Sequence, residues 1–195
     1  MRSLEAFLRL VDSLEPGDRI LDLGSGTGAH AVAFREQGMD VVTLSLIPPA
    51  DIVGDFFEGA LPPVDAIWAS HVLEHQVDPG AFLRRCFALL PDGGMLAVTV
   101  PHDRRDLAGG HVIAWSEGLL AYHLVLAGFD CSAARVGLYR RQLSFVLRKV
   151  ARPHVDGLIN DRGDLEKLAR FFPWPVEHHG SAFKGQARWK RRERG

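Results

Sequence analysis

The stretch ILDLGSGTGAH, residues 20–30, decides the fold. A short apolar run leads into a glycine-rich loop, and the segment AHAVAFREQG, residues 29–38, is typical of a helix that ends at its glycine. A strand, a glycine loop and a helix in this order begin the nucleotide-binding unit of an α/β protein. The sequence therefore predicts that a ligand binds at the carboxyl end of this first strand.

The glycines of this loop fit two classes of ligand. Gly24, Gly26 and Ala29 satisfy the dinucleotide pattern G-x-G-x-x-G/A, in which backbone N–H groups hold a pyrophosphate. Asp22, however, places a carboxylate two residues before the first glycine, and an anion there suits a ligand with an ammonium and a sulfonium better than one with phosphates. A dinucleotide site also needs an acid about 20 residues further on, where this chain has Ser45. Charge therefore favours a cationic cofactor.

Strands and helices alternate along the rest of the chain. Apolar runs predict four more strands, at residues 40–44, 51–53, 65–69 and 95–100. Amphipathic or capped segments predict helices at residues 4–14, 78–90 and 116–127. Apolar strands that alternate with helices indicate a parallel sheet covered on both faces. Two extended runs, at residues 129–137 and 142–149, leave no room for a helix between them and predict an antiparallel hairpin at the end of the sheet.

Three motifs in this order resemble those of a known family: ILDLGSGTG at residues 20–28, GDFFEGALPPVDAIWASHVLEH at residues 54–75, and LLPDGGMLAVTVP at residues 89–101. Together they resemble the class I S-adenosylmethionine-dependent methyltransferases, especially the small-molecule branch whose fourth strand runs into an H-x-L-E-H segment. The resemblance covers about residues 17–150.

The resemblance implies an α/β fold with a Rossmann-like, doubly wound sheet of seven strands, mostly parallel, that ends in the antiparallel hairpin. We expect residues 1–150 to form the S-adenosylmethionine-binding methyltransferase domain, with its N-terminal helix. Residues 151–195 form a C-terminal extension with one helix and a basic tail.

The same resemblance implies where S-adenosyl-L-methionine binds. Ser45 stands where the family usually grips both ribose hydroxyls with an Asp or Glu, and a hydroxyl makes weaker hydrogen bonds than a carboxylate. Asp55 either contacts the adenine together with Phe56 or is only a turn residue after Gly54. The implied cofactor-binding set is Asp22, Gly24, Ser25, Gly26, Gly28, Ser45, Asp55, Phe56, Ser70 and His71.

Three histidines fall on loops expected at the carboxyl edge of the sheet. His71 and His75 follow the fourth strand, and His111 lies between the fifth strand and the next helix. A histidine can accept a proton near neutral pH, so these three are the candidate catalytic bases for an acceptor hydroxyl. Alternatively, they only orient loops or shape the pocket.

One motif within this segment also has a second interpretation. His71, Glu74 and His75 spell H-x-x-E-H, which is the inverted zinc-protease signature. Zinc hydrolysis needs both histidines on one helical face, whereas this segment leaves a buried strand and meets a helix start only at Asp78. We therefore expect no metal site.

Composition limits the partners. The formal net charge is −1, but residues 184–194 carry six basic side chains, so the body of the protein is acidic, which argues against nucleic acid as a partner. No apolar run approaches the roughly 18 to 20 residues that span a bilayer, so we expect neither a membrane segment nor a secretory signal. Cys86 and Cys131 lack metal or redox spacing, which is typical of free thiols in the cytoplasm.

The sequence thus predicts a cytoplasmic S-adenosylmethionine-dependent methyltransferase that acts on a small-molecule or sugar-like acceptor. The alternative is a cofactor-binding partner or regulatory protein of the same fold without transfer activity, which the departure at Ser45 favours. The segment between the fifth strand and residue 128 is too short for a substrate domain. We therefore expect an open pocket or one completed by a second copy of the chain in a homodimer.

Overall fold

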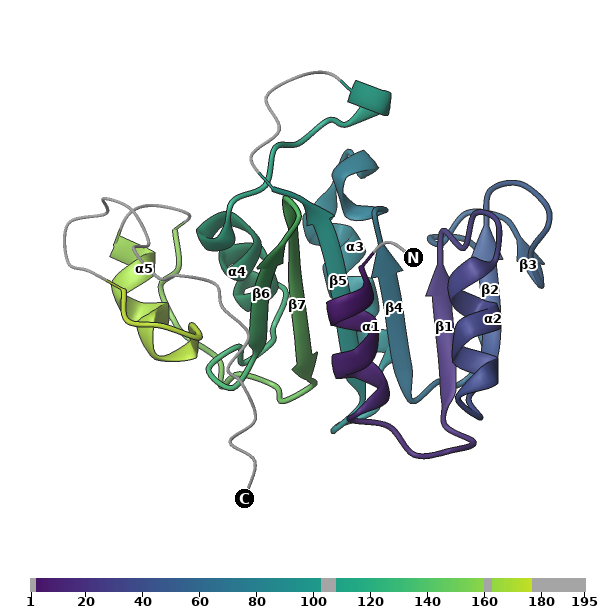
Figure 1. Ribbon diagram of the computed structural model, residues 1–195. Helices are drawn as coiled ribbons and strands as arrows, with labels where there is room; N and C mark the ends of the chain where they lie inside the picture. Colours follow the sequence, from purple (N-terminus) through teal and green to yellow (C-terminus); the bar gives the residue numbers. More distant parts are fainter. Residues whose placement is uncertain (1–2, 103–107, 160–162, 177–195) are drawn as a thin grey trace.

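A seven-stranded sheet runs through the centre of the computed structural model, which describes residues 3–102, 108–159 and 163–176 (Figure 1). Its order is β3-β2-β1-β4-β5-β7-β6, and β7 runs antiparallel to both of its neighbours whereas the other pairs are parallel. This arrangement confirms the predicted doubly wound sheet and its closing hairpin. The strands are β1 (Arg19–Leu23), β2 (Asp40–Ser45), β3 (Ile52–Val53), β4 (Ala66–Ser70), β5 (Met95–Pro101), β6 (Arg135–Tyr139) and β7 (Gln142–Arg148).

The strand order reverses at β1. Leu23, the last residue of β1, pairs with Leu44 of β2 on one side and with Ala69 of β4 on the other. In open α/β sheets, ligands bind beyond the carboxyl ends of the strands at such a reversal. The topology therefore places a binding crevice directly above the glycine loop that follows β1.

Helices cover both faces of the sheet (Figure 1). α1 (Leu4–Val11) and α2 (Ala29–Glu36) lie on one face, where the aromatic rings of Phe7, Phe34 and Trp68 pack with centroids 4.5 to 6.4 Å apart. α3 (Pro79–Leu89) and α4 (Glu117–Leu126) lie on the other face and bury a larger apolar cluster. Burial on both faces explains why the central strands are mostly apolar.

Capping groups begin the helices of the second face. Asp78 Oδ1 accepts a hydrogen bond from the N–H of Ala81 at 2.8 Å, and a proline follows at the first helical position. Ser116 Oγ caps α4 by accepting from the N–H of Leu119 at 3.3 Å. Both helices therefore begin where the sequence predicts.

The segment after α4 differs from its prediction. Residues 129–134 were expected to begin a strand, but the strand starts only at Arg135. The N–H of Cys131 instead donates to the carbonyl of Phe171, in the 3-10 turn η3 (Ala169–Phe171), which follows α5 (Gly163–Leu168). Tertiary contact with the C-terminal segment thus overrides the local preference for an extended strand. The basic tail at residues 184–194 lies outside the described residues. In the described part of the chain, no helix is long and apolar enough to cross a bilayer.

Candidate functional site

The carboxyl ends of β1, β4 and β5 meet at one edge of the sheet, the upper edge in Figure 1. The 3-10 turn η1 (Leu73–His75) follows β4 at this edge, and η2 (Ala108–Gly110) lies beyond the end of β5. The segments that leave these strands carry the glycine loop and the three predicted catalytic histidines. The structure therefore gathers most of the predicted site at one place.

The glycine loop requires glycine for two separate reasons. Gly24, Gly26 and Gly28 have φ values of 66°, 54° and 75°, in the left-handed region that side chains with a Cβ rarely adopt. A Cβ on Gly24 would also lie 2.5 Å from Cγ2 of Val72, in the segment after β4. The loop is thus pressed against η1, and its backbone is left free to approach a ligand closely.

Two polar side chains at this loop are buried without a visible role. Asp22 is 1% exposed and Ser25 is 7% exposed. Within the described part of the chain, no hydrogen bond reaches Asp22 Oδ2 or Ser25 Oγ. Burial raises the pKa of Asp22 to about 7, although the positive charge of Arg35 opposes the rise. Unpaired buried polar atoms are costly, and a ligand with hydrogen-bond donors would satisfy both. This pair therefore fits the ammonium end of a methionine-like cofactor.

Ser45 ends β2, at the position expected to face a ribose. Its Oγ accepts a hydrogen bond from the N–H of Ile47 at 3.3 Å, which leaves the hydroxyl hydrogen for a ligand. Asp51 follows in the same loop but bonds the N–H and Oγ1 of Thr43, at 2.9 and 2.8 Å. These hydrogen bonds lower the pKa of Asp51 and tie its carboxylate to the middle of β2. Asp51 is therefore engaged elsewhere, and ribose binding by Ser45 stays a prediction.

The predicted adenine contacts take different places. Asp55 Oδ1 accepts a hydrogen bond from the N–H of Phe57 at 2.9 Å, so Asp55 does act as a turn residue. Phe56 is buried, with its ring centroid 5.0 Å from that of Phe82 in the core below. The accessible ring beside Asp55 is Phe57, 42% exposed, which the sequence did not single out. Adenine contact by Asp55 and Phe56 stays a prediction.

Ser70 and His71 leave β4 next to a buried carboxylate. Ser70 Oγ lies 2.8 Å from Oγ of Ser3, so the start of α1 is seated on the end of this strand. His71 has a φ of 59°, and its Nδ1 lies 3.0 Å from Oε1 of Glu74. A carboxylate that accepts the Nδ1–H of an imidazole leaves Nε2 as the proton acceptor. His71 thus has the geometry of an oriented base.

His75 and His111 come together from two different loops. Their ring centroids lie 4.9 Å apart in an edge-to-face arrangement. The N–H of Val112 donates to the carbonyl of Glu74 at 2.9 Å, and this hydrogen bond holds the loop after η2 against η1. Glu74 itself is fully buried. From the sequence, Glu74 stands out only as part of the H-x-x-E-H pattern. That pattern was the signal by which its proximity to the histidines could have been found.

A histidine–glutamate pair lies at the end of β5. His102 Nε2 is 3.0 Å from Oε2 of Glu117 at the start of α4, and both side chains are partly buried. Residues 103–107, which follow, are not among those described. The pair anchors α4 to β5 and borders the edge that carries the other histidines.

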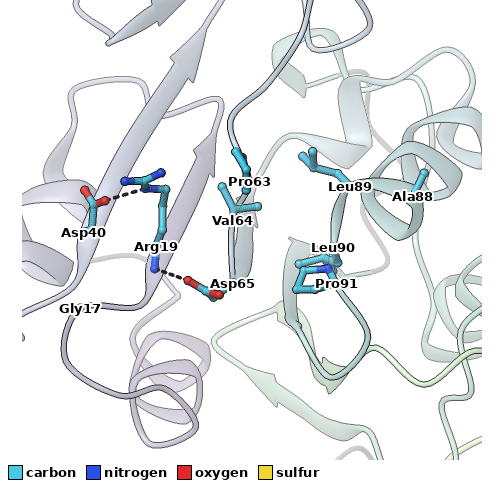
Figure 2. A pocket seen from close by; sticks show the side chains of 10 residues that line it. All are labelled: Gly17, Arg19, Asp40, Pro63, Val64, Asp65, Ala88, Leu89, Leu90 and Pro91. Carbon is cyan, nitrogen blue, oxygen red and sulfur yellow. Dashed lines mark hydrogen bonds and ion pairs between the residues drawn. The ribbon is translucent and has the colours of Figure 1, made fainter.

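A hollow lies at the opposite edge of the sheet (Figure 2). It measures about 640 Å³ and is lined by residues from the amino ends of β1, β2 and β4 and from the end of α3. Its polar groups already pair with one another, since Arg19 Nε bonds Asp40 at 2.6 Å and the N–H of Arg19 bonds Asp65 at 2.8 Å (Figure 2). The unpaired Asp22 and Ser25, rather than this hollow, identify the candidate site.

Comparison with known proteins identifies the family of this chain. The profile of the family described as "Methyltransferase domain" matches residues 2–124, which include the glycine loop, η1 and the loop that carries His111. The chain is 30% identical to the ubiquinone biosynthesis O-methyltransferase of Xylella fastidiosa (strain M23), over 43% of this chain and 42% of that protein. The chain therefore matches less than half the length of this curated relative.

Solved structures share the fold. The Burkholderia thailandensis 1,6-didemethyltoxoflavin-N1-methyltransferase, with bound 1,6-didemethyltoxoflavin and S-adenosylhomocysteine, superposes with a TM-score of 0.65 at 21% identity, over 75% of this chain and 77% of that one. A SAM-dependent methyltransferase from Archaeoglobus fulgidus superposes with a TM-score of 0.61 at 12% identity, over 76% and 95% of the two chains. At these identities the likeness establishes the architecture.

Proposed function

Because this chain belongs to the methyltransferase-domain family, we propose that it transfers a methyl group from S-adenosylmethionine to a small-molecule acceptor. The observation that carries the proposal is the buried carboxylate of Asp22 beside the glycine loop, whose Oδ2 accepts no hydrogen bond from the described residues. A carboxylate in this position repels the pyrophosphate of a dinucleotide but attracts the ammonium of S-adenosylmethionine.

Different residues of the proposed site bind different parts of the cofactor. Asp22 accepts hydrogen bonds from the ammonium, and Ser25 binds the same end of the molecule. The backbone of Gly24, Gly26 and Gly28 allows close approach. Ser45 offers its hydroxyl to the ribose, which is a weaker contact than a carboxylate would make. Binding therefore depends chiefly on the methionine end.

The chemistry is a direct displacement. Bound S-adenosylmethionine supplies an electrophilic methyl group on a sulfonium, which is already a good leaving group. The protein then has to hold the acceptor in line and remove its proton, and orientation alone can supply roughly 7 to 11 kcal/mol of the barrier. We propose His71, His75 and His111 as the groups that act on the acceptor. Among them, His71 is the one whose ring a carboxylate orients, through Glu74.

A small acceptor is supported by the character of the relatives. The curated relative is named for ubiquinone biosynthesis, and the toxoflavin enzyme was solved with a small heterocycle. The connection between β5 and α4 comprises residues 102–116 and is too short to form a separate substrate domain. We therefore infer an acceptor that is small enough to enter at the sheet edge, with a pocket that is open or completed by a second copy of the chain.

The alternative function is cofactor binding without transfer. Ser45 is the observation that favours it, because the ribose clamp is weakened. Both functions predict that S-adenosylhomocysteine raises the thermal stability of the protein by mass action, whereas NAD does not. Only the enzyme converts S-adenosylmethionine to S-adenosylhomocysteine when a panel of small phenols, amines and sugars is supplied.

Variants separate binding from catalysis. Asp22→Asn should abolish the stabilisation by S-adenosylhomocysteine, whereas His71→Gln should keep it and lower turnover by a factor of about 10² to 10⁴. A stabilisation by NAD that exceeds the one by S-adenosylhomocysteine would overturn the proposal.

A further inference from the structure

Three metal-binding side chains converge at the site edge. Glu74, His75 and His111 each offer one ligand atom, and these three atoms all lie within 4.8 Å of one another. Glu74 and His75 belong to η1, whereas His111 comes from the loop after η2, 36 residues further on. The hydrogen bond from the N–H of Val112 to the carbonyl of Glu74 joins these two loops. The convergence is therefore fixed by the backbone.

One of the two carboxylate oxygens of Glu74 has no hydrogen-bond partner among the described residues. The side chain is fully buried, and only Oε1 is engaged, by Nδ1 of His71 at 3.0 Å. No hydrogen bond from the described residues reaches Oε2. A buried carboxylate oxygen without a partner is costly, and a cation is one of the few groups that can compensate it. Glu74 thus has an unpaired Oε2, and one of its carboxylate oxygens lies within 4.8 Å of a ring nitrogen of both His75 and His111.

The surrounding hydrogen bonds orient the ligands as metal sites do. His75 Nδ1 lies 3.2 Å from the carbonyl of Gly110, and because a carbonyl can only accept, Nδ1 carries the hydrogen and Nε2 keeps its lone pair. Metal-bound histidines usually donate their second N–H to a carbonyl or carboxylate in this way, and metal-bound carboxylates are held by their own hydrogen bonds. His71 provides that support for Glu74.

We propose that Glu74, His75 and His111 form a binding site for one divalent transition metal ion, best suited to Zn²⁺. Two imidazole nitrogens and one carboxylate oxygen are the donor set of open zinc sites, whereas Mg²⁺ prefers oxygen ligands alone. Zinc–ligand bonds of about 2.0 to 2.2 Å put neighbouring ligand atoms about 3.4 Å apart in a tetrahedron. The ligand atoms therefore have to close from at most 4.8 Å by side-chain rotation, and His75 is the exposed member of the three.

The site differs from the zinc-protease arrangement that H-x-x-E-H suggests. There, both histidines of the motif bind the metal from one helix. Here η1 covers only residues 73–75, and His71 precedes it in a left-handed conformation with its ring turned to Glu74. In the proposed site, His111 takes the place of the first histidine of the motif as a ligand, and the proposal differs from the expectation of no metal site, which stays a prediction.

Three protein ligands leave at least one coordination position open. Resting on the proposed function, we assign that position to an oxygen of the methyl acceptor. A metal-bound hydroxyl loses its proton to solvent more easily. Its oxygen then forms a bond to the methyl carbon as the carbon–sulfur bond breaks and the electron pair leaves with sulfur. The acceptor would accordingly be an alcohol or phenol.

Metal binding can be tested without the cofactor. Tag-free full-length protein is freed of metal with EDTA, dialysed, and titrated with Zn²⁺ by calorimetry and with Co²⁺ by visible absorption. We expect one metal per chain and a Co²⁺ spectrum of low coordination number. His75→Ala, His111→Ala and Glu74→Gln should each weaken Zn²⁺ binding by more than about 100-fold. His154→Ala is the matched control, because His154 also pairs with an acid, Asp156, at 3.1 Å but lies outside the cluster.

The outcomes separate this proposal from the proposed function. Circular dichroism checks that each variant folds. His75→Ala changes a solvent-exposed residue, so it is the substitution that should disturb folding least. Full-strength Zn²⁺ binding by folded His75→Ala and His111→Ala, or no binding by the wild type, would overturn the site. Acetohydroxamate, a two-oxygen probe, should shift the Co²⁺ spectrum, and an unchanged spectrum would remove the open position. A protein that binds Zn²⁺ but not S-adenosylhomocysteine would keep this site and lose the proposed function.

Discussion

Replacement of Asp22 by Asn tests whether ionised Asp22, beside the glycine loop, destabilises the protein when no cofactor is bound. Burial raises the pKa of Asp22 from 3.8 to about 7, a shift of about three units. At about 1.36 kcal/mol per unit, ionised Asp22 costs the cofactor-free protein up to about 4 kcal/mol at high pH. Between pH 4 and pH 7 the folded protein binds the extra proton and the unfolded chain does not, so stability falls as the pH rises through this range and is flat above it.

The assay is urea unfolding of the wild type and of Asp22→Asn at pH 5 and at pH 8, without cofactor. Asn has nearly the same shape but does not titrate. The stability of the wild type relative to the variant should therefore drop by roughly 2 to 3 kcal/mol between the two pH values. Any constant cost of the amide cancels in this double difference.

Asp51→Asn serves as the control because the pKa of Asp51 is lowered by its hydrogen bonds to Thr43. Its stabilising effect is present above the unfolded pKa and is lost only in acid, so its double difference between pH 5 and pH 8 should be near zero. A double difference for Asp22→Asn below about 0.5 kcal/mol would refute the reasoning. It would mean that Asp22 is solvated or paired in solution, so that the protein has no buried, unpaired anion to bind the ammonium of the cofactor.

Three further predictions concern the loop, the ribose position and the core. Gly24→Ala should prevent binding of S-adenosylhomocysteine in calorimetry, because the added Cβ would lie 2.5 Å from Val72. Gly28→Ala, whose Cβ would have nothing within 4 Å, should cost only the backbone strain of about 1 kcal/mol. Equal effects of the two substitutions would contradict the steric explanation. Ser45→Asp should tighten S-adenosylhomocysteine binding about tenfold by adding a charge-assisted ribose contact, and a weaker affinity for the variant would argue against the ribose position. Phe34→Ala, at a fully buried position, should lower the unfolding free energy by about 3 to 5 kcal/mol in urea, while Val32→Ala on the same helix, 54% exposed, should change it by less than about 0.5 kcal/mol; similar losses would mean that α2 is packed differently.

Local patterns predicted the fold well because its strands are bounded by strong signals. The glycine loop after β1 and the proline after Asp78 each constrain the backbone within a few residues, and both elements begin where expected. The start of β6 was missed because Cys131 bonds the carbonyl of Phe171, a partner 40 residues away in the chain. A contact of that kind has no local signature.

The candidate site was predictable in part for the same reason. Asp22, near the end of β1, and the glycines that follow this strand are close neighbours in the sequence, so their spacing alone conveys their chemistry. Glu74 and His111 are brought together by the backbone hydrogen bond of Val112, and nothing in either segment announces the other. Adenine contact by Phe56 stays a prediction, and in the structure its ring packs against Phe82 while that of the adjacent Phe57 is exposed.

The seating of Ser3 on the end of β4 bears on how this protein should be handled. Ser3 is buried, its N–H donates to Oε1 of Gln142 at 2.9 Å, and its hydroxyl touches Ser70, the neighbour of His71. A polyhistidine tag joined close to Ser3 would therefore lie beside the candidate site and would compete for the metal proposed there. Placement of the tag away from Ser3 leaves the contacts of Ser3 with Ser70 and Gln142 intact.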